Sequence, residues 1–173
     1  DPVVFLDSKG RAYTVTAGDL PPARGDGAPA SSLVDVQDGA RIMHALAGKA
    51  DLPVMVASSG GYGFLCKLGD MTSNRKAGRE FMTIEASEVP LAPVVYAESS
   101  AKMVAALSAM GRLLVFDVAE MRSVARGRGV IIMGLDPGET MLAVTLLLQR
   151  RGFKPGIVSR GYGRVVETLA HVD

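Results

Sequence analysis

Short apolar runs and glycine-containing turns alternate along most of this chain. Residues 3–6 are Val-Val-Phe-Leu, a turn follows at residues 8–10, and the β-forming residues 12–16 come next. Such runs of four to eight residues, bounded by turn residues, are typical of strands. Helical periodicity is weak and is confined to residues 38–46 and 142–149. The pattern therefore predicts an all-β chain.

Polar and apolar residues alternate within single runs, which predicts the two faces of a strand. In residues 64–68 the apolar side chains Phe64, Cys66 and Leu68 lie two positions apart, so they share one face, and Lys67 lies on the other. A set of methionines occupies similar strand positions and is expected to pack in the core: Met55, Met71, Met82, Met103, Met121 and Met133.

The order of turn, corner and glycine loop repeats about every fifty residues. The turn glycines, 51 and 50 residues apart, are Gly10, Gly61 and Gly111. The same spacing relates the corner residues Leu20, Met71 and Met121, and the loop glycines Gly27, Gly78 and Gly129. A fixed period of this size marks a propeller, a solenoid or another array, and four short strands per period match a propeller blade. We expect one domain over 1–173, with units at about 1–49, 50–98 and 99–147 and an incomplete unit at 148–173.

Composition agrees with one compact β array. The chain has 173 residues, 48% of them hydrophobic, so its core can be sizeable. No stretch reaches eighteen apolar residues, so we expect no membrane-spanning segment. The single cysteine excludes an internal disulfide framework, which fits a reducing cytosol. The chain begins without an initiator methionine and is therefore expected to be a fragment of a longer protein.

Charge is nearly balanced overall but unevenly distributed. The net charge is +1, yet residues 1–98 carry nine Lys and Arg against twelve Asp and Glu, whereas residues 99–173 carry ten against six. Basic residues also recur at matched places near the hairpins and in the glycine loops: Lys9, Arg11, Lys67, Arg112, Arg24, Arg75, Lys76, Arg79, Arg126 and Arg128. Equivalent positions of a repeat array lie on equivalent edges, so we expect a basic stripe along one rim. Such a stripe is the electrostatic footprint of a polyanion-binding surface.

The combination of turn, basic glycine loop and period resembles a known family. The second unit reads Gly61-Tyr62-Gly63-Phe64-x-Cys66-x-x-x-Asp70-Met71-x-x-x-Arg75-x-Ala77-Gly78-Arg79, which resembles a repeat in the C-terminal domain of the topoisomerase IV A subunit, within the gyrase A-like type IIA topoisomerases. Asp7-Ser8-Lys9-Gly10-Arg11-Ala12-Tyr13 and Met110-Gly111-Arg112-Leu113-Leu114-Val115-Phe116 fit the repeats on either side. The resemblance covers about residues 1–147.

The resemblance implies a β-pinwheel, a closed or C-shaped disc of propeller-like blades with a basic rim around which duplex DNA bends. It implies no chemistry and no cofactor in this domain, which would hold a DNA segment for the strand-passage core and tune topology preference. The implied partners are duplex DNA, a chromosome-condensing complex, the ATPase B subunit, and the rest of the A subunit, in the bacterial cytoplasm at the nucleoid. Recurring loop contacts of this kind address phosphates rather than bases.

The tail departs from the pattern and permits two alignments. A complete fourth unit would place its hairpin near residue 161, whereas an offset of 27 matches residues 154–161 to residues 128–134 and requires a shortened unit; we prefer the second, which predicts strand structure in residues 156–172. Gln149-Arg150-Arg151-Gly152-Phe153-Lys154-Pro155-Gly156 resembles the gyrase box, although Phe153 replaces a glycine and Pro155 is inserted. We interpret it as a DNA-contacting loop, so the expected contacts also include Arg150, Arg151, Lys154, Arg160 and Arg164.

Catalytic alternatives find little support in the residues. Two histidines, His44 and His171, and the single Cys66 offer no cluster with metal-ligand spacing, and we interpret Cys66 as a small buried hydrophobe. Residues 60–63 are rich in glycine but lack the Lys-Ser/Thr ending of a phosphate-binding loop. The recurring acids are expected to accept turn N–H groups: Asp19, Asp70 and Glu120. The alternative function is a propeller-like interaction module whose stripe faces an acidic partner protein.

Overall fold

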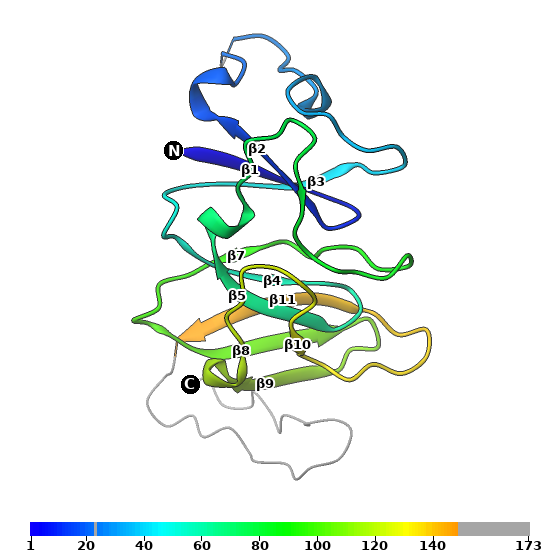
Figure 1. Ribbon diagram of the computed structural model, residues 1–173. Coiled ribbons are helices and arrows are strands. Elements are labelled where there is room, and N and C mark those ends of the chain that lie inside the picture. The colour runs from blue at the N-terminus through cyan, green and yellow to red at the C-terminus, as the bar shows by residue number, and fades with distance from the viewer. Residues whose placement is uncertain (23, 149–173) are drawn as a thin grey trace.

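The fold consists of three antiparallel sheets stacked face to face, as Figure 1 shows for the computed structural model. The structure describes residues 1–22 and 24–148. Within them the only helical segments are four short 3-10 turns: η1 (Ala17–Asp19), η2 (Ala30–Ser32), η3 (Leu68–Met71) and η4 (Val118–Glu120). The described residues contain no helix long and apolar enough to cross a membrane.

Each sheet is built on a hairpin followed by a strand that returns to the first strand of that hairpin. The hairpins are β1 (Pro2–Asp7) with β2 (Arg11–Thr16), β4 (Pro53–Ala57) with β5 (Tyr62–Lys67), and β8 (Ala101–Ser108) with β9 (Leu113–Asp117). The returning strands are β3 (Ile42–Ala47), β7 (Val94–Val95) and β11 (Met141–Leu148). The two segments of weak helical periodicity therefore overlap strands β3 and β11.

The fourth strand of the first two sheets comes from the following repeat. β6 (Arg79–Glu80) pairs with β2, so a segment of the second unit completes the first sheet. β10 (Val130–Ile131) pairs with β5 in the same way and completes the second sheet. Successive units are therefore interlocked by backbone hydrogen bonds as well as by packing.

The periodic turn glycines make this exchange possible. Gly10 and Gly61 have φ angles of 83° and 85°, a region that favours glycine. The carbonyl of Gly10 accepts hydrogen bonds from the N–H groups of Phe81 and Met82, at 3.2 and 2.8 Å, and the carbonyl of Gly61 accepts the equivalent pair from residues 132 and 133, at 2.7 and 3.3 Å. The expected placement of these glycines in equivalent hairpins is confirmed.

Apolar side chains fill both spaces between the sheets. Val4 and Leu6 of β1 pack with Val56, Phe64 and other residues of the second sheet. The opposite face of the second sheet packs against the third, through a cluster that includes Met55, Val104 and Phe116. All six methionines assigned to the core are buried, as are Phe64, Cys66 and Leu68, while Lys67 is exposed. The predicted strand faces are therefore confirmed.

The outer face of the first sheet is covered by its own connecting loop. Val3, Phe5, Tyr13 and Val15 form a cluster with the buried Val34 and with neighbouring residues of the loop between β2 and β3. Beneath this cover, the hydroxyl of Tyr13 donates to Oδ2 of the buried Asp7 at 2.8 Å, and Oδ1 of Asp7 accepts the N–H groups of residues 9 and 11. The buried carboxylate thus closes the first hairpin.

Candidate nucleic-acid interface

The basic glycine loops lie along the same edge of successive sheets. The loop before β6 contacts β2, where the N–H of Ser73 donates to Oγ1 of Thr14 at 2.9 Å. The loop before β10 contacts β5, where the N–H of Val124 donates to the carbonyl of Leu65 at 3.0 Å. These contacts occur at equivalent repeat positions, so each loop runs beside the hairpin of the preceding sheet.

Glycine permits the close approach of each loop to that edge. Gly78 and Gly129 have φ angles of 63° and 81°. A Cβ atom on Gly78 would overlap the carbonyl oxygen of Ala12, and one on Gly129 would overlap that of Gly63. The loop glycines therefore hold the two loops against equivalent strands, which explains why they share the period of the repeat.

Several predicted basic residues project from these loops without an internal partner. Arg75 and Lys76, in the loop before β6, are exposed, and so is Arg126, in the loop before β10. Their side chains make no hydrogen bond or ion pair with the described residues. Arg24, in the loop of the first unit, is also exposed, as is Lys67 at the end of β5. Arg79 is half-buried at the start of β6.

Other predicted basic residues are engaged within the fold. Nζ of Lys9 donates to the carbonyl of Asp38 at 2.9 Å. Arg11 spans the first junction, where its Nε donates to the carbonyl of Ala77 at 2.5 Å and its Nη2 to that of Gly78 at 3.2 Å. These two cations hold neighbouring loops in place.

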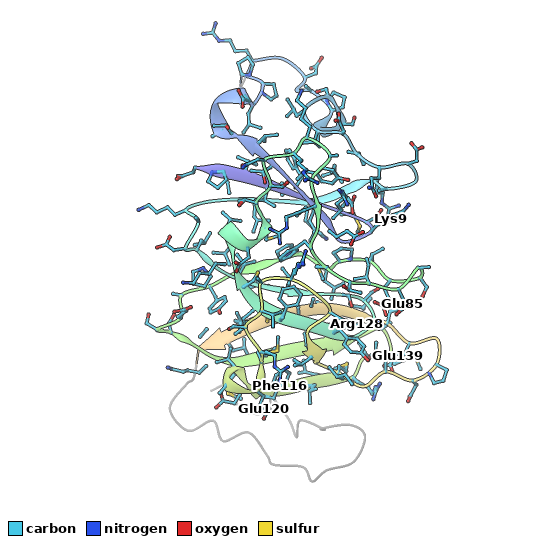
Figure 2. All side chains as sticks on the ribbon, viewed as in Figure 1. Lys9, Glu85, Phe116, Glu120, Arg128 and Glu139 are labelled. Carbon is cyan, nitrogen blue, oxygen red and sulfur yellow. The ribbon has the colours of Figure 1, made fainter. Side chains whose placement is uncertain are left out.

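Two further arginines, Arg112 and Arg128, are paired with carboxylates near the hairpin ends. Nε of Arg112 donates to Oε1 of Glu139 at 3.0 Å, and its Nη2 contacts Oε2 of the same carboxylate. Arg128 pairs with Glu85 and Glu88 at 2.6 and 3.2 Å. Figure 2 shows Lys9, Glu85, Arg128 and Glu139 along one side of the molecule, where the hairpin turns lie. Acidic groups therefore neutralise much of the basic charge at the hairpin ends.

Arg122 is an exposed cation that the repeat pattern did not single out. It lies just after η4, and its backbone carbonyl accepts the N–H of Leu65 at 2.9 Å, so the residue follows the edge of β5 towards Arg126. The equivalent position of the second unit is Thr72, so recurrence gave no signal. The excess of basic residues after residue 99 was the available clue.

Two curated proteins are similar to this chain over most of its length. The A subunit of DNA topoisomerase 4 from Neisseria gonorrhoeae is 44% identical over 138 residues, which are 77% of this chain and 18% of that protein. The protein of the same name from Escherichia coli K12 is 34% identical over 138 residues, 80% of this chain and 18% of that protein. This chain therefore spans less than a fifth of the length of these relatives. No protein-family model matches it.

Solved structures agree with the sequence relatives. The C-terminal domain of E. coli ParC superposes with a TM-score of 0.78 at 31% identity, covering 85% of this chain and 62% of that one. The chain belongs to the family of C-terminal domains found in topoisomerase IV A subunits. The C-terminal domain of DNA gyrase A, with a TM-score of 0.65 at 18% identity, covers 84% of this chain and 47% of that one and shares the fold. The predicted β-pinwheel is confirmed; whether the disc is closed or C-shaped stays a prediction.

The cysteine of this topoisomerase IV domain has the structural role that the sequence indicates. Cys66 is buried on the face of β5 that packs against the first sheet. Burial, followed by the charge of Asp70, raises the pKa of the Cys66 thiol to about 12. The thiol is therefore protonated at neutral pH and is a poor nucleophile. Asp70 accepts the N–H of Lys67 at 2.9 Å, which confirms the turn-capping role expected of that acid.

Glu139 of the topoisomerase IV domain gives stability a dependence on pH. Hydrogen bonds from Arg112 and Ser108 lower the pKa of the Glu139 carboxyl from its ordinary value of 4.5 to about 2. The ionised form is therefore favoured by folding, and its contribution is complete above pH 4.5 and lost as pH falls towards about 2. Glu139→Gln should lower the melting temperature at pH 7, and the difference from wild type should shrink across this acid range.

Thermal unfolding at several pH values measures this difference. Glu98→Gln is the matched control, because Glu98 is exposed and forms no ion pair with a described residue. A Glu139→Gln effect that stays constant from pH 7 to pH 2 would contradict the linkage.

The remaining predicted contacts, Arg150, Arg151, Lys154, Arg160 and Arg164, lie outside the described residues, as does the strand expected in residues 156–172.

Proposed function

We propose that this domain binds duplex DNA through its phosphate backbone, without reading base sequence, along the edge formed by the basic glycine loops. The observation that supports the proposal is the placement of Arg75, Lys76 and Arg126, which are exposed and without a partner among the described residues. They lie on equivalent edges of successive sheets. Arg122 adds a further exposed cation to the loop before β10.

The free cations favour phosphate contacts over base readout. Long basic side chains on loops can reach backbone oxygens, whereas direct readout places a helix or a β-ribbon in the major groove. Loops repeated from sheet to sheet give contacts spaced along the stack of sheets, and a duplex that bends can meet several of them. We therefore propose that the domain bends the duplex, with preferences set by DNA deformability rather than by base contacts.

Within the whole enzyme, we propose that this is a non-catalytic accessory domain of the A subunit of a type IIA topoisomerase. It presents a DNA segment to the strand-passage core and tunes topology preference. The proposed partners are a chromosome-condensing complex, the ATP-hydrolysing B subunit, and the remainder of the A subunit, and the proposed location is the bacterial cytoplasm at the nucleoid. We also propose that residues 1–173 form a single domain.

A salt series with labelled duplexes tests the proposal. Two duplexes of unrelated sequence should bind with similar affinity, and log affinity should fall linearly with log salt with a slope of about −3 to −4 if four cations each neutralise one phosphate. Separate labels at the two duplex ends report bending through energy transfer. Failure to bind either duplex, together with binding to a polyglutamate peptide, would instead support the protein-interaction module. Strong binding to only one duplex would contradict backbone recognition.

A further inference from the structure

Arg128 links the second and third units. Its guanidinium carbon lies 4.0 Å from the centroid of the Tyr62 ring, and its side chain is 30% exposed. Nε of Arg128 is buried and has no hydrogen-bond partner among the described residues. The side chain is therefore held by the face of an aromatic ring and by its terminal nitrogens, an arrangement that suits the planar guanidinium.

Two carboxylates bind these terminal nitrogens. Nη1 of Arg128 donates to Oε1 of Glu85 at 2.6 Å, and Nη2 donates to Oε1 of Glu88 at 3.2 Å. Glu88 is itself anchored, because its Oε2 accepts the N–H of Glu85 at 3.2 Å and the hydroxyl of Ser58 at 3.4 Å. Figure 2 shows Arg128 beside Glu85 at the hairpin side of the molecule. A cation paired in this way has little free charge to offer a phosphate.

The backbone around Arg128 is also fixed to the second unit. The N–H of Gly127 donates to the carbonyl of Phe81 at 2.9 Å, and the carbonyl of Gly127 accepts the N–H of Thr83 at 3.0 Å. Gly129 lies against Gly63 of β5. Arg126 is thus the exposed cation immediately before an anchored segment, and its position depends on that anchor.

The first junction contains the same kind of anchor with the arginine on the opposite side. There, Arg11 of the hairpin donates to the carbonyls of Ala77 and Gly78 in the next loop. At the second junction Tyr62 occupies the position equivalent to Arg11, and Arg128 occupies the position equivalent to Ala77. An arginine ties loop to hairpin in both cases, although it comes from a different unit.

We infer that Arg128 is a positioning residue, which fixes the second basic loop so that Arg126 reaches the DNA, and that it makes no phosphate contact of its own. This inference rests on the proposed function. Arg128 and Arg126 therefore have different roles, although the two lie in the same Arg-Gly-Arg-Gly motif and look equivalent in the sequence. Arg11 has the corresponding role for the loop that contains Arg75 and Lys76.

A double-mutant cycle tests the inference: the wild-type domain, the two single variants and the double variant are compared for melting temperature and for binding to the same labelled duplex. Arg126→Ala should reduce the salt slope by about 0.9 and leave the melting temperature unchanged. Arg128→Ala should lower the melting temperature by several degrees and reduce the slope by no more than Arg126→Ala does. The double variant should bind DNA as Arg126→Ala alone does, because the anchor acts through the residue that is already missing.

A second double variant tests rescue. Tyr62→Arg combined with Arg128→Ala recreates the arrangement of the first junction, and it should regain both the melting temperature and the salt slope of the wild type. A slope reduction of about 1.8 in Arg126→Ala/Arg128→Ala would show that Arg128 contacts its own phosphate and would overturn the inference. A lower melting temperature in Arg128→Ala with unchanged affinity and slope would also overturn it. Absence of duplex binding by the wild type would instead refute the proposed function.

Discussion

Replacing Arg75, Lys76 and Arg126 together by glutamate is expected to weaken duplex binding by about 100-fold or more at about 0.1 M salt. All three side chains are exposed on the two loops that follow equivalent sheet edges. Each phosphate neutralised contributes about 0.9 to the salt slope, so loss of three contacts should reduce the slope by about 2.7. The folded state should be little changed, because no described internal partner is lost.

A second triple variant tests whether the loss of DNA binding depends on where the charges lie or only on the net charge. Arg41, Lys49 and Lys102 are exposed cations that do not belong to the two loops, and their replacement by glutamate changes the net charge by the same amount. This control should retain most of the salt slope, because long-range electrostatics alter association more than the number of phosphate contacts. Equal loss of slope in the two variants would show that the loops are not the binding edge.

Gly129→Ala is expected to destabilise the domain by about 3 kcal/mol or more. The φ angle of 81° at Gly129 is unfavourable for alanine, and the added Cβ would overlap the backbone carbonyl of Gly63. That carbonyl belongs to β5, whose pairing with both β4 and β10 prevents it from moving aside. Chemical denaturation of the variant and of the wild type measures the loss.

Gly138→Ala is the matched control for this substitution. Gly138 has a similar φ angle of 78°, but no described atom lies within 4 Å of the position of its Cβ. It should therefore show the conformational cost alone, about 1–2 kcal/mol. Equal destabilisation by the two substitutions would mean that the loop does not approach β5 as closely as the structure indicates.

Much of the fold followed from local features of the sequence. The spacing of Gly10 and Gly61 predicted equivalent hairpins, and the two-residue alternation from Phe64 to Leu68 predicted which side chains enter the core. Both predictions rest on short-range geometry, since a turn requires a particular φ angle and a strand has two faces. Strands β3 and β11 were harder to predict, because their mixed apolar patterns also permit a helix.

Local sequence features do not indicate the partner of each exchanged strand. An apolar run such as residues 130–133 indicates a strand, but nothing local shows that β10 pairs with β5 of the preceding unit. The roles of the basic residues depend on such distant pairing too. Arg126 and Arg128 differ only because the fold brings Glu85, Glu88 and Tyr62 to one of them.

The exchange of strands between neighbours also constrains how such a chain can gain or lose repeats during evolution. Gly10 and Gly61 each receive the same two hydrogen bonds from a segment about seventy residues further along the chain. If one whole period were duplicated or removed, each segment that donates these hydrogen bonds would still follow an equivalent hairpin that accepts them. This would hold wherever in the repeat the duplication or deletion began. Loss of part of a period would leave a donor without its acceptor edge. The architecture is therefore compatible with arrays that differ in length by whole units.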